Sequence, residues 1–279
     1  MTFVDFPEAF LERLKLILSE GDFASVCSQL GRRERTIFRI NPLKADLGRV
    51  KNELDEAGIE FVSVDAGLLE CFEVSGKKRR ELTETKAFYE GAIFIQNPSS
   101  QLAAVVLQPE PGEEVLDLAA APGGKTIHLA GLMRNEGFMT AVEVIKGRFY
   151  KLKGNLERCG ATMVDSQMMD GRAAGKRWPG RFDRVLLDAP CSSEARFKKG
   201  DAKSWEHWSP RKIKETSRKQ KRLILAAFDA LKPGGTLLYS TCSFAPEENE
   251  GIVQSLIKRV GDAVEVLPIP LDLPHARSG

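Results

Sequence analysis

From Glu113 onward, short apolar segments alternate in a regular order with longer segments that have helical periodicity. The predicted strands are 114–118, 137–144, 161–168, 182–187, 235–240 and 263–269, and the predicted helices are 125–133, 146–158, 210–231 and 247–260. Strands that alternate with helices pair in parallel through right-handed crossovers. This part of the chain therefore predicts an α/β fold with a doubly wound, mostly parallel sheet.

The first 96 residues alternate smaller elements and predict a separate unit. Helices are expected within 5–30 and at 50–57, and strands at 36–40, 60–64, 71–74 and 92–96. We therefore expect a small α+β N-terminal domain over residues 1–96 and a larger α/β domain over 97–279. Sheets of this kind often close with an antiparallel hairpin, which has no counterpart here. Either the sheet is shorter than usual or the natural chain continues past Gly279.

The composition excludes several classes of protein. No apolar run approaches roughly 18 residues, and the N-terminus lacks the basic stretch and apolar core of a secretory signal. The five cysteines are widely spread and never in C-x-x-C spacing, and the three histidines are scattered. These patterns argue against a membrane span, a disulfide framework and a metal site. We expect a cytoplasmic, monomeric protein that binds no metal.

Positive charge is concentrated in one segment. The whole chain has a net charge of +2, whereas Ala195–Arg222 holds 11 Lys and Arg against 3 Asp and Glu, a local +8. Phe197, Trp205 and Trp208 lie among these basic residues. Basic side chains neutralise phosphates, and aromatic rings stack on unpaired bases. The segment favours a nucleic acid partner, with a solvated helix face as the alternative.

A loop of small residues follows the first predicted strand of the larger domain. It reads Ala119-Ala120-Ala121-Pro122-Gly123-Gly124-Lys125, after which a helix begins. Such a loop lets a ligand approach the backbone, and the helix N-terminus offers free N–H groups. The P-loop and dinucleotide patterns are excluded, because residue 119 is Ala and no G-x-G-x-x-G occurs. What remains suits a ligand with a nucleoside and an amino acid but no pyrophosphate.

Acidic residues follow the next three predicted strands. Glu143 ends the second strand, Asp170 follows the third and Asp188 follows the fourth. An acid after the second strand typically accepts hydrogen bonds from ribose hydroxyls, and Asp170 could receive an adenine amino group. The matched positions in one sheet favour a shared site over three unrelated surface acids.

Two cysteines also leave predicted strands at the carboxyl edge, where open α/β sheets place their ligand crevice. Cys191 follows Asp-Ala-Pro in Leu186–Ser193, and Cys242 follows Ser-Thr in Leu238–Ser243. Buried structural cysteines usually lie inside apolar runs instead. One thiol in a cleft indicates a nucleophile, and two indicate a reaction in which a covalent bond forms and is later broken. The residues alone leave the two roles interchangeable.

Several motifs resemble those of the Nol1/Nop2/Sun-type RNA cytosine-5 methyltransferases, over nearly the whole chain. They are Phe38-Arg39-Ile40-Asn41-Pro42-Leu43-Lys44, Gln96-Asn97-Pro98-Ser99-Ser100-Gln101, the loop before Thr126, Asp188-Ala189-Pro190-Cys191-Ser192 and Tyr239-Ser240-Thr241-Cys242-Ser243. The resemblance implies a Rossmann-like class I methyltransferase sheet. It also implies that S-adenosylmethionine is bound by Ala119, Ala120, Ala121, Pro122, Gly123, Gly124, Lys125, Glu143, Arg148, Asp170 and Asp188.

The same resemblance implies the catalytic roles. Cys242 is expected to be the nucleophile that adds to C6 of cytosine, and Cys191 to assist its release. Asp188, with Lys125 as a further catalytic candidate, is expected to hold the N3/N4 edge of the base. The chain departs from the family pattern at Ser193-Glu194-Ala195, where glycines are more common, and at Glu143, where Asp is common.

The implied function is S-adenosylmethionine-dependent methylation of C5 of an unpaired or flipped cytosine in RNA, with rRNA favoured over tRNA. A DNA cytosine-5 methyltransferase is one alternative, but it would use the Pro-Cys thiol as nucleophile and would not need Cys242. A non-catalytic RNA-binding assembly factor is the other. Binding of S-adenosylmethionine without a methylated product would support that alternative.

Overall fold

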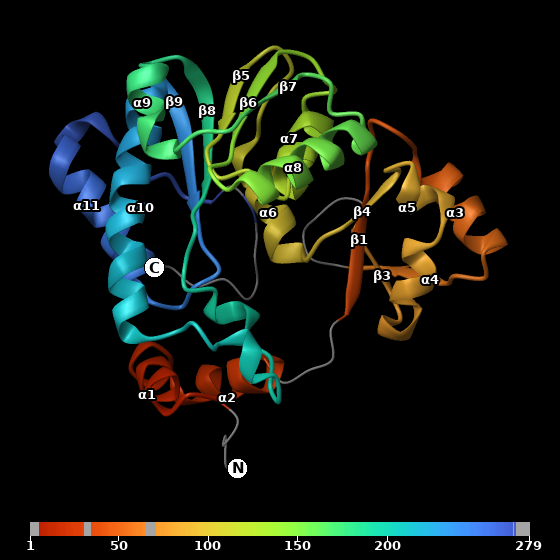
Figure 1. The fold of residues 1–279 in the computed structure, drawn as a ribbon, viewed down its shortest axis with the longest axis horizontal. Helices are drawn as coiled ribbons and strands as arrows, with labels where there is room; N and C mark the ends of the chain where they lie inside the picture. Colours follow the sequence, from red (N-terminus) through yellow and green to blue (C-terminus); the bar gives the residue numbers. More distant parts are fainter. Residues whose placement is uncertain (1–5, 31–34, 65–70, 270, 272–279) are drawn as a thin grey trace.

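A parallel sheet forms the centre of the larger part of the chain (Figure 1). The structure is a computed structural model and describes residues 6–30, 35–64, 71–269 and 271. The strands are β5 (Glu114–Asp117), β6 (Phe138–Val142), β7 (Val164–Gln167), β8 (Phe182–Asp188) and β9 (Leu231–Ser240). They pair in parallel in the order β7-β6-β5-β8-β9. The predicted α/β sheet is confirmed, and its order reverses between β5 and β8, which places the ligand crevice at their carboxyl ends.

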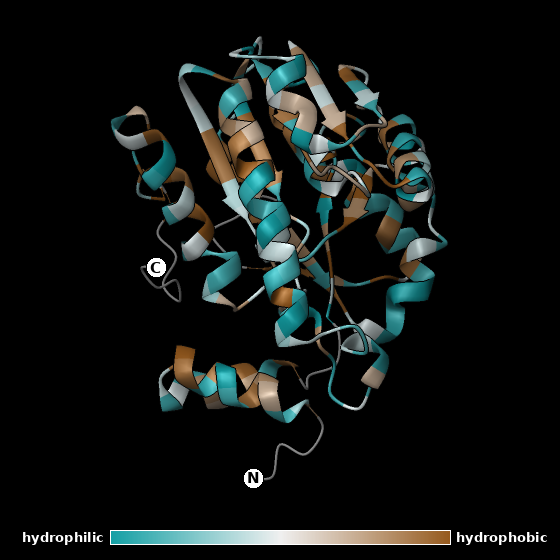
Figure 2. Ribbon diagram, turned by 60° about the vertical axis from the view of Figure 1, so that its left-hand side comes forward, coloured by the Kyte–Doolittle hydropathy of each residue, from teal (hydrophilic) through white to brown (hydrophobic). Residues whose placement is uncertain are grey.

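Helices cover both faces of this sheet (Figure 1). One face is covered by α6 (Pro98–Leu107), α7 (Gly124–Leu132) and α8 (Lys146–Cys159), and the other by α9 (Ala174–Arg177), α10 (Pro210–Ala230) and α11 (Glu250–Val260). Each set packs its apolar side on the strands as a separate core. Figure 2 shows the hydrophobic strands behind the largely hydrophilic outer face of α10. Among the described helices, none is both long and apolar enough for a membrane span.

The strand predicted at 263–269 is wrong. A 3-10 turn, Gly261–Ala263, is followed by residues 264–269 without regular structure, and Val266, Leu267 and Ile269 are exposed. The alternation of apolar residues there resembles a strand, but Pro268 lacks the N–H group that a sheet ladder needs, and so does residue 270 in the sequence. Within the described residues, β9 is therefore an edge strand.

A second, antiparallel sheet occupies the N-terminal part of the chain. Its strands are β1 (Thr36–Ile40), β2 (Phe61–Ser63), β3 (Cys71–Val74) and β4 (Ile93–Ile95), in the order β2-β3-β1-β4. Three helices accompany it: α3 (Leu47–Glu56), α4 (Arg79–Thr83) and α5 (Lys86–Tyr89). These elements enclose their own apolar core, which includes Phe38, Leu54 and Leu82. The predicted α+β arrangement is thus present before α6 begins.

The first two helices, α1 (Glu8–Ile17) and α2 (Glu20–Leu30), form a hairpin that packs elsewhere. Their apolar side contacts the segment 197–208 of the larger part, beneath α10 in Figure 1. Phe197, Trp205 and Trp208 belong to this cluster, and Phe197 is 2% exposed. Phe197 is therefore not available to stack on bases, and Trp205 and Trp208 are half-buried beside the hairpin.

Candidate active site

The two predicted cysteines meet at the carboxyl edge of the sheet. Cys191 follows β8 and Cys242 follows its parallel neighbour β9, so the strand pairing brings both loops together. The two Sγ atoms lie 3.2 Å apart, and the backbone N–H of Cys242 donates to Cys191 Sγ at 3.3 Å. Both side chains are half-buried. This contact allows a proton to be shared between the thiols.

The environment makes the two thiols unequal. The hydrogen bond from Cys191 lowers the pKa of Cys242 to about 6, although burial acts in the opposite direction, and the positive charge of Arg196 adds to the lowering. The same contact, together with burial, raises the pKa of Cys191 well above its usual value. The contact therefore favours a thiolate at Cys242 and a protonated thiol at Cys191.

Asp188, at the end of β8, is held by two donors. Lys125 Nζ, from the first turn of α7, lies 2.6 Å from one carboxylate oxygen, and Ser240 Oγ donates to the other at 3.0 Å. The Lys125 side chain is 14% exposed and that of Asp188 is 32% exposed. The negative charge of Asp188 also opposes ionisation of Cys242, so the carboxylate lies near the thiols. The ion pair orients Asp188 while leaving part of it accessible.

The loop Ala119–Lys125 crosses the carboxyl ends of β5 and its neighbours. The N–H group of Ala120 donates to the carbonyl of Val142 in β6 at 2.9 Å. The N–H group of Gly123 donates to the carbonyl of Ala120 at 2.8 Å. Gly123 has φ +104°, a conformation that favours glycine. The Ala121–Pro122 peptide bond is cis. The glycines and small side chains keep this backbone within reach of a ligand.

Glu143 follows β6 and is almost fully buried, at 4% exposure. Its carboxylate accepts the backbone N–H of Ile145 at 2.8 Å and lies 3.4 Å from the guanidinium of Arg148. Arg148 also donates to the carbonyl of Ala121 at 2.6 Å. Arg148 thus contacts the loop directly, and Glu143 is connected to the loop through Arg148.

Asp170 lies beyond β7 and is more exposed. It caps the 3-10 turn Gly171–Ala173 by accepting the backbone N–H of Arg172 at 2.9 Å. The Arg172 side chain also pairs with it, and this hydrogen bond lowers the pKa of Asp170. The carboxylate is therefore charged but already engaged, so a ligand there would share it with Arg172.

Asp117, the last residue of β5, is a buried acid that the sequence motifs did not single out. It is 1% exposed and accepts a hydrogen bond from Thr126 Oγ1 at 2.7 Å. Burial raises its pKa to about 6, against the effect of that hydrogen bond. A charged residue inside the apolar run Val115-Leu116-Asp117-Leu118 was the available signal.

Arg39 of β1 was also missed, although it stands inside one of the quoted motifs. It is 1% exposed, and it donates to Gln96 Oε1 at 3.0 Å and to the carbonyl of Gly124 at 3.1 Å. Gly124 is the first residue of α7 and part of the cofactor loop. Burial lowers the pKa of Arg39 to about 10. One side chain of the small sheet therefore reaches the loop of the large one.

The basic residues of α10 lie on its exposed face. They are Arg211, Lys212, Lys214, Arg218, Lys219, Lys221 and Arg222, whereas Ile213, Thr216, Ser217 and Gln220 face inward. Polar contacts at the buried side of this region connect Gln220 to Glu248 (3.2 Å) and to the carbonyl of Pro190 (2.9 Å). The positive surface of α10 is thus anchored beside the loop that carries Cys191. Among the described residues, no group of His, Cys, Asp and Glu is arranged to hold a metal ion.

Comparison with known proteins identifies the relatives of this chain. The family described as 16S rRNA methyltransferase RsmB/F matches residues 104–276. Ribosomal RNA small subunit methyltransferase F of Klebsiella pneumoniae (strain 342) is 38% identical over 276 residues, which cover 95% of this chain and 56% of that protein. The crystal structure of PH0851 has a TM-score of 0.84 at 36% identity, covering 92% of this chain and 57% of its own. A methyltransferase homolog protein from Pyrococcus horikoshii has a TM-score of 0.75 at 33% identity, covering 95% of this chain and 86% of its own.

These matches agree with the motifs in the sequence. The chain spans little more than half the length of the curated relatives that it matches, between 55% and 58%. The family match nevertheless includes the cofactor loop, the acids at the strand ends and both cysteines. The resemblance to the Nol1/Nop2/Sun class is confirmed, and the chain belongs to the 16S rRNA methyltransferase RsmB/F family.

Proposed function

We propose that this chain carries the catalytic unit of an S-adenosylmethionine-dependent enzyme that methylates C5 of cytosine in RNA through a covalent cysteine adduct. The observation that carries the proposal is the pair of unequal thiols, 3.2 Å apart, beside the ion pair of Asp188 and Lys125. A thiolate next to a protonated thiol suits a reaction in which one sulfur forms a bond and the other assists in breaking it.

The chemistry of the crevice fits the methyl donor. The exposed backbone of the loop, the carboxylate of Glu143 held near it by Arg148, and the charged Asp170 suit a ligand with ribose hydroxyls and amino groups. S-adenosylmethionine, when bound, supplies an electrophilic methyl group. The residues that would hold it are Ala119, Ala120, Ala121, Pro122, Gly123, Gly124, Lys125, Glu143, Arg148, Asp170 and Asp188.

The chain's own residues account for the activation of the base. The thiolate of Cys242 adds to C6 of cytosine, which makes C5 electron-rich. Asp188, oriented by Lys125, accepts a hydrogen bond from the amino group at C4 and so fixes the ring over the thiolate. Positioning of this kind supplies much of the rate of a transfer reaction.

Release of the product requires the second cysteine. After methyl transfer, Cys191 releases its own proton to solvent, and its thiolate then removes the proton from C5, the C5–H electrons form the C5=C6 bond, and Cys242 leaves as a thiolate. The pKa of Cys191 is raised by its contact with the neighbouring Cys242 and by burial. Because Cys242 is an uncharged thioether in the adduct, the opposition that comes from the charge of Cys242 is absent when the base is needed.

Several observations support RNA, and rRNA in particular, as the substrate. The family match and the curated relatives are rRNA methyltransferases by name. The base must be unpaired or flipped for a thiol to reach C6, as in single-stranded or looped RNA. The exposed basic face of α10 would neutralise phosphates beside the crevice. Cytoplasmic location and a monomeric state remain predictions.

The test is a methylation assay with purified protein, S-adenosylmethionine and small-subunit rRNA, tRNA or single-stranded DNA. Bisulfite sequencing then locates 5-methylcytosine. We expect modification at discrete cytosines of rRNA that disappears with Cys242→Ala. Modification of DNA alone would favour the DNA methyltransferase alternative, and cofactor binding without any product would favour the assembly factor.

A further inference from the structure

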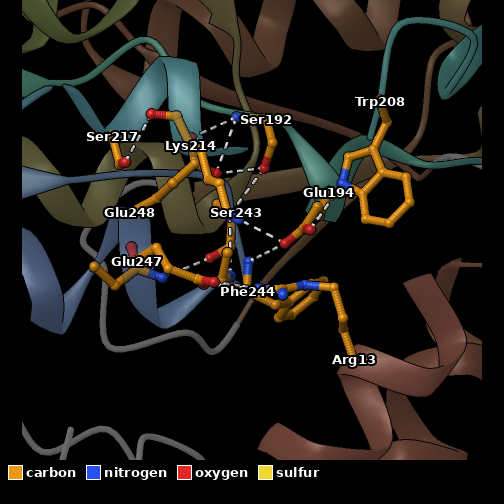
Figure 3. Close-up of polar contacts among 12 residues, drawn as sticks. Arg13, Ser192, Glu194, Trp208, Lys214, Ser217, Ser243, Phe244, Glu247 and Glu248 are labelled. Atoms are coloured by element: carbon orange, nitrogen blue, oxygen red, sulfur yellow. Dashed lines mark hydrogen bonds and ion pairs between the residues drawn. The ribbon is translucent and has the colours of Figure 1, made fainter. Parts of the chain in front are cut away.

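The loops that carry the two thiols are held together by buried carboxylates, as Figure 3 shows. Glu194 is 2% exposed and lies between Trp208 and the chain that follows Cys242. It accepts hydrogen bonds from Trp208 Nε1 at 2.9 Å, Ser243 Oγ at 3.0 Å and the backbone N–H of Phe244 at 2.8 Å. All three donors are neutral groups, and they supply the hydrogen bonds that a buried carboxyl group needs.

These contacts fix the backbone that leaves Cys242 on its C-terminal side. Ser243 and Phe244 are the two residues after it, and its own carbonyl accepts the N–H of Ala195 at 3.0 Å. Ala195 directly follows Glu194 in the 3-10 turn Glu194–Arg196. The turn therefore holds the loop of Cys242 by two kinds of contact, the backbone N–H of Ala195 and the side chain of Glu194.

A second buried carboxylate performs the matching task for Cys191. Glu248 is 0% exposed and accepts the backbone N–H of Ser192, the residue after Cys191, at 3.0 Å. Ser192 and Ser243 also share a hydrogen bond of 3.0 Å between their hydroxyls. Each thiol is thus followed by a residue that a buried acid from another segment holds in place.

Glu194 also connects the site to the N-terminal hairpin. The ring of Trp208 packs on Phe10 of α1, with centroids 5.8 Å apart, while its N–H group serves Glu194. Arg13 of α1 pairs with Glu247, next to Glu248, at 2.7 Å. The hairpin therefore contacts Trp208, which donates to Glu194, and Glu247, the sequence neighbour of Glu248.

We infer that Glu194 is a positioning residue for the thiol pair, and that through Trp208 it makes the contact between Cys242 and Cys191 depend on the docked α1–α2 hairpin. The catalytic consequence of this inference rests on the proposed function, whereas the thiol geometry itself does not. Without the Glu194 contacts, the loop of Cys242 is free to move away from Cys191. Arg196 lies in the same turn, so its charge would move as well.

The ionisation of Cys242 reports this geometry in the absence of RNA. Cys191 and Arg196 both lower the pKa of Cys242, so displacing them raises it toward the ordinary value of 9.0. Alkylation by iodoacetamide, followed by mass spectrometry of the Cys242 peptide, gives the pH at which the thiolate forms. We expect Glu194→Gln to raise this midpoint by about one unit, which means about tenfold less thiolate below the midpoint.

Matched variants separate positioning from a loss of charge or fold. Glu250→Gln removes an exposed acid near the same loop and should leave the midpoint unchanged. Trp208→Phe keeps the ring contact with α1 but removes the indole donor, and should shift the midpoint in the same direction. If Glu194→Gln does not fold, Trp208→Phe is the deciding variant. A midpoint equal to that of the wild type in the folded variant, with only a lower Tm, would overturn the inference.

Enzyme kinetics provides the second measurement. Glu194→Gln should lower kcat for RNA methylation about tenfold or more with little change in the Kd of S-adenosylmethionine, because Glu194 bonds to Trp208, Ser243 and Phe244 and not to the cofactor loop. An equal loss in cofactor affinity would contradict a role confined to the thiols. A wild-type protein that methylates no RNA, but whose Cys242 midpoint still shifts in Glu194→Gln, would refute the proposed function and leave the positioning role intact.

Discussion

At the residue scale, the chemistry of the site depends on how two thiols share one proton. Thiols in hydrogen-bond contact do not ionise independently, since the first thiolate to form is stabilised by the remaining S–H group and opposes the second. The contact between Cys191 and Cys242 therefore favours one nucleophile of the pair. Which sulfur carries the charge is decided by surroundings such as Arg196.

Replacing each cysteine separately should give opposite results. Cys242→Ala should abolish methylation and leave no covalent complex, because the nucleophile is gone. Cys191→Ala should allow addition and methyl transfer but stall elimination, so that protein stays bonded to RNA. A denaturing gel with labelled RNA distinguishes the two outcomes. An RNA-linked band with Cys242→Ala and none with Cys191→Ala would reverse the roles.

The pH dependence of Cys242 alkylation should depend on Cys191. In the wild type, the rate should be nearly constant above pH 7 and fall as pH decreases through about 6, where the thiolate of Cys242 takes up a proton. In Cys191→Ala the stabilising hydrogen bond is absent, so the midpoint should move up toward 9.0. Peptide-resolved alkylation between pH 5 and 10 measures both curves. Identical midpoints would mean that the thiols do not interact in solution.

The sequence predicted the reactive groups better than it predicted the buried acids that hold the cysteine loops in place. Cys191, Cys242 and Asp188 stand at strand ends in recognisable motifs, so their meeting followed from the topology. Glu194 and Glu248 lie in polar segments where acids are normally exposed. Their burial depends on donors far away in the chain, which local patterns do not reveal.

At the scale of elements, the carboxyl end of β6 should contribute to cofactor affinity. Glu143→Ala should weaken binding of S-adenosylmethionine by about 1.5–3 kcal/mol, the cost of removing charge-assisted hydrogen bonds. Titration calorimetry measures the change. Glu136→Ala, at an exposed position just before the opposite end of the same strand, is the control and should bind normally. Unchanged affinity in Glu143→Ala would refute the ribose assignment.

The basic segment before and along α10 should control the salt dependence of RNA binding. Neutralising Lys198, Lys199 and Arg211 together should weaken binding and flatten the plot of log K against log salt, by up to about one unit of slope for each phosphate that is no longer neutralised. Neutralising Lys258 and Arg259, exposed on α11, should change the slope less. Equal slopes in the wild type and the triple variant would indicate a merely solvated face.

The prediction of secondary structure and of exposed surfaces failed where one residue pattern is compatible with two different structures. The alternating apolar residues of 263–269 suggested a strand, but Pro268 interrupts any ladder. Phe197, Trp205 and Trp208 suggested a stacking surface, but Phe197 is buried and the two Trp rings pack partly against the hairpin α1–α2. In both cases the residue types were compatible with the prediction, and the surroundings of the segment decided the outcome.

At the scale of the whole molecule, the two sheets are joined through buried polar groups beside the cofactor loop. Arg39 reaches from β1 to the carbonyl of Gly124 at 3.1 Å, and Asn41 donates to the carbonyl of Cys159 at 2.8 Å. An unpaired buried carbonyl costs about 1–3 kcal/mol, so separating the sheets would be unfavourable at each of these hydrogen bonds. The sequence indicated two units, but the buried charge that joins them became visible only in three dimensions.

This junction should make the whole protein sensitive to acid through His128 of α7. Burial, with the nearby charge of Arg39, lowers the pKa of His128 to about 3 from 6.5. The unfolded chain binds a proton at His128 more readily than the folded protein does. The free energy of unfolding is therefore unaffected by His128 above pH 6.5, and it decreases as pH falls toward 3, by up to about 1.4 kcal/mol per pH unit. Urea unfolding across this range should give a shallower pH dependence for His128→Gln. His207→Gln, whose side chain is 89% exposed, should keep the wild-type slope. Equal slopes for all three proteins would show that His128 titrates normally and that the junction admits water.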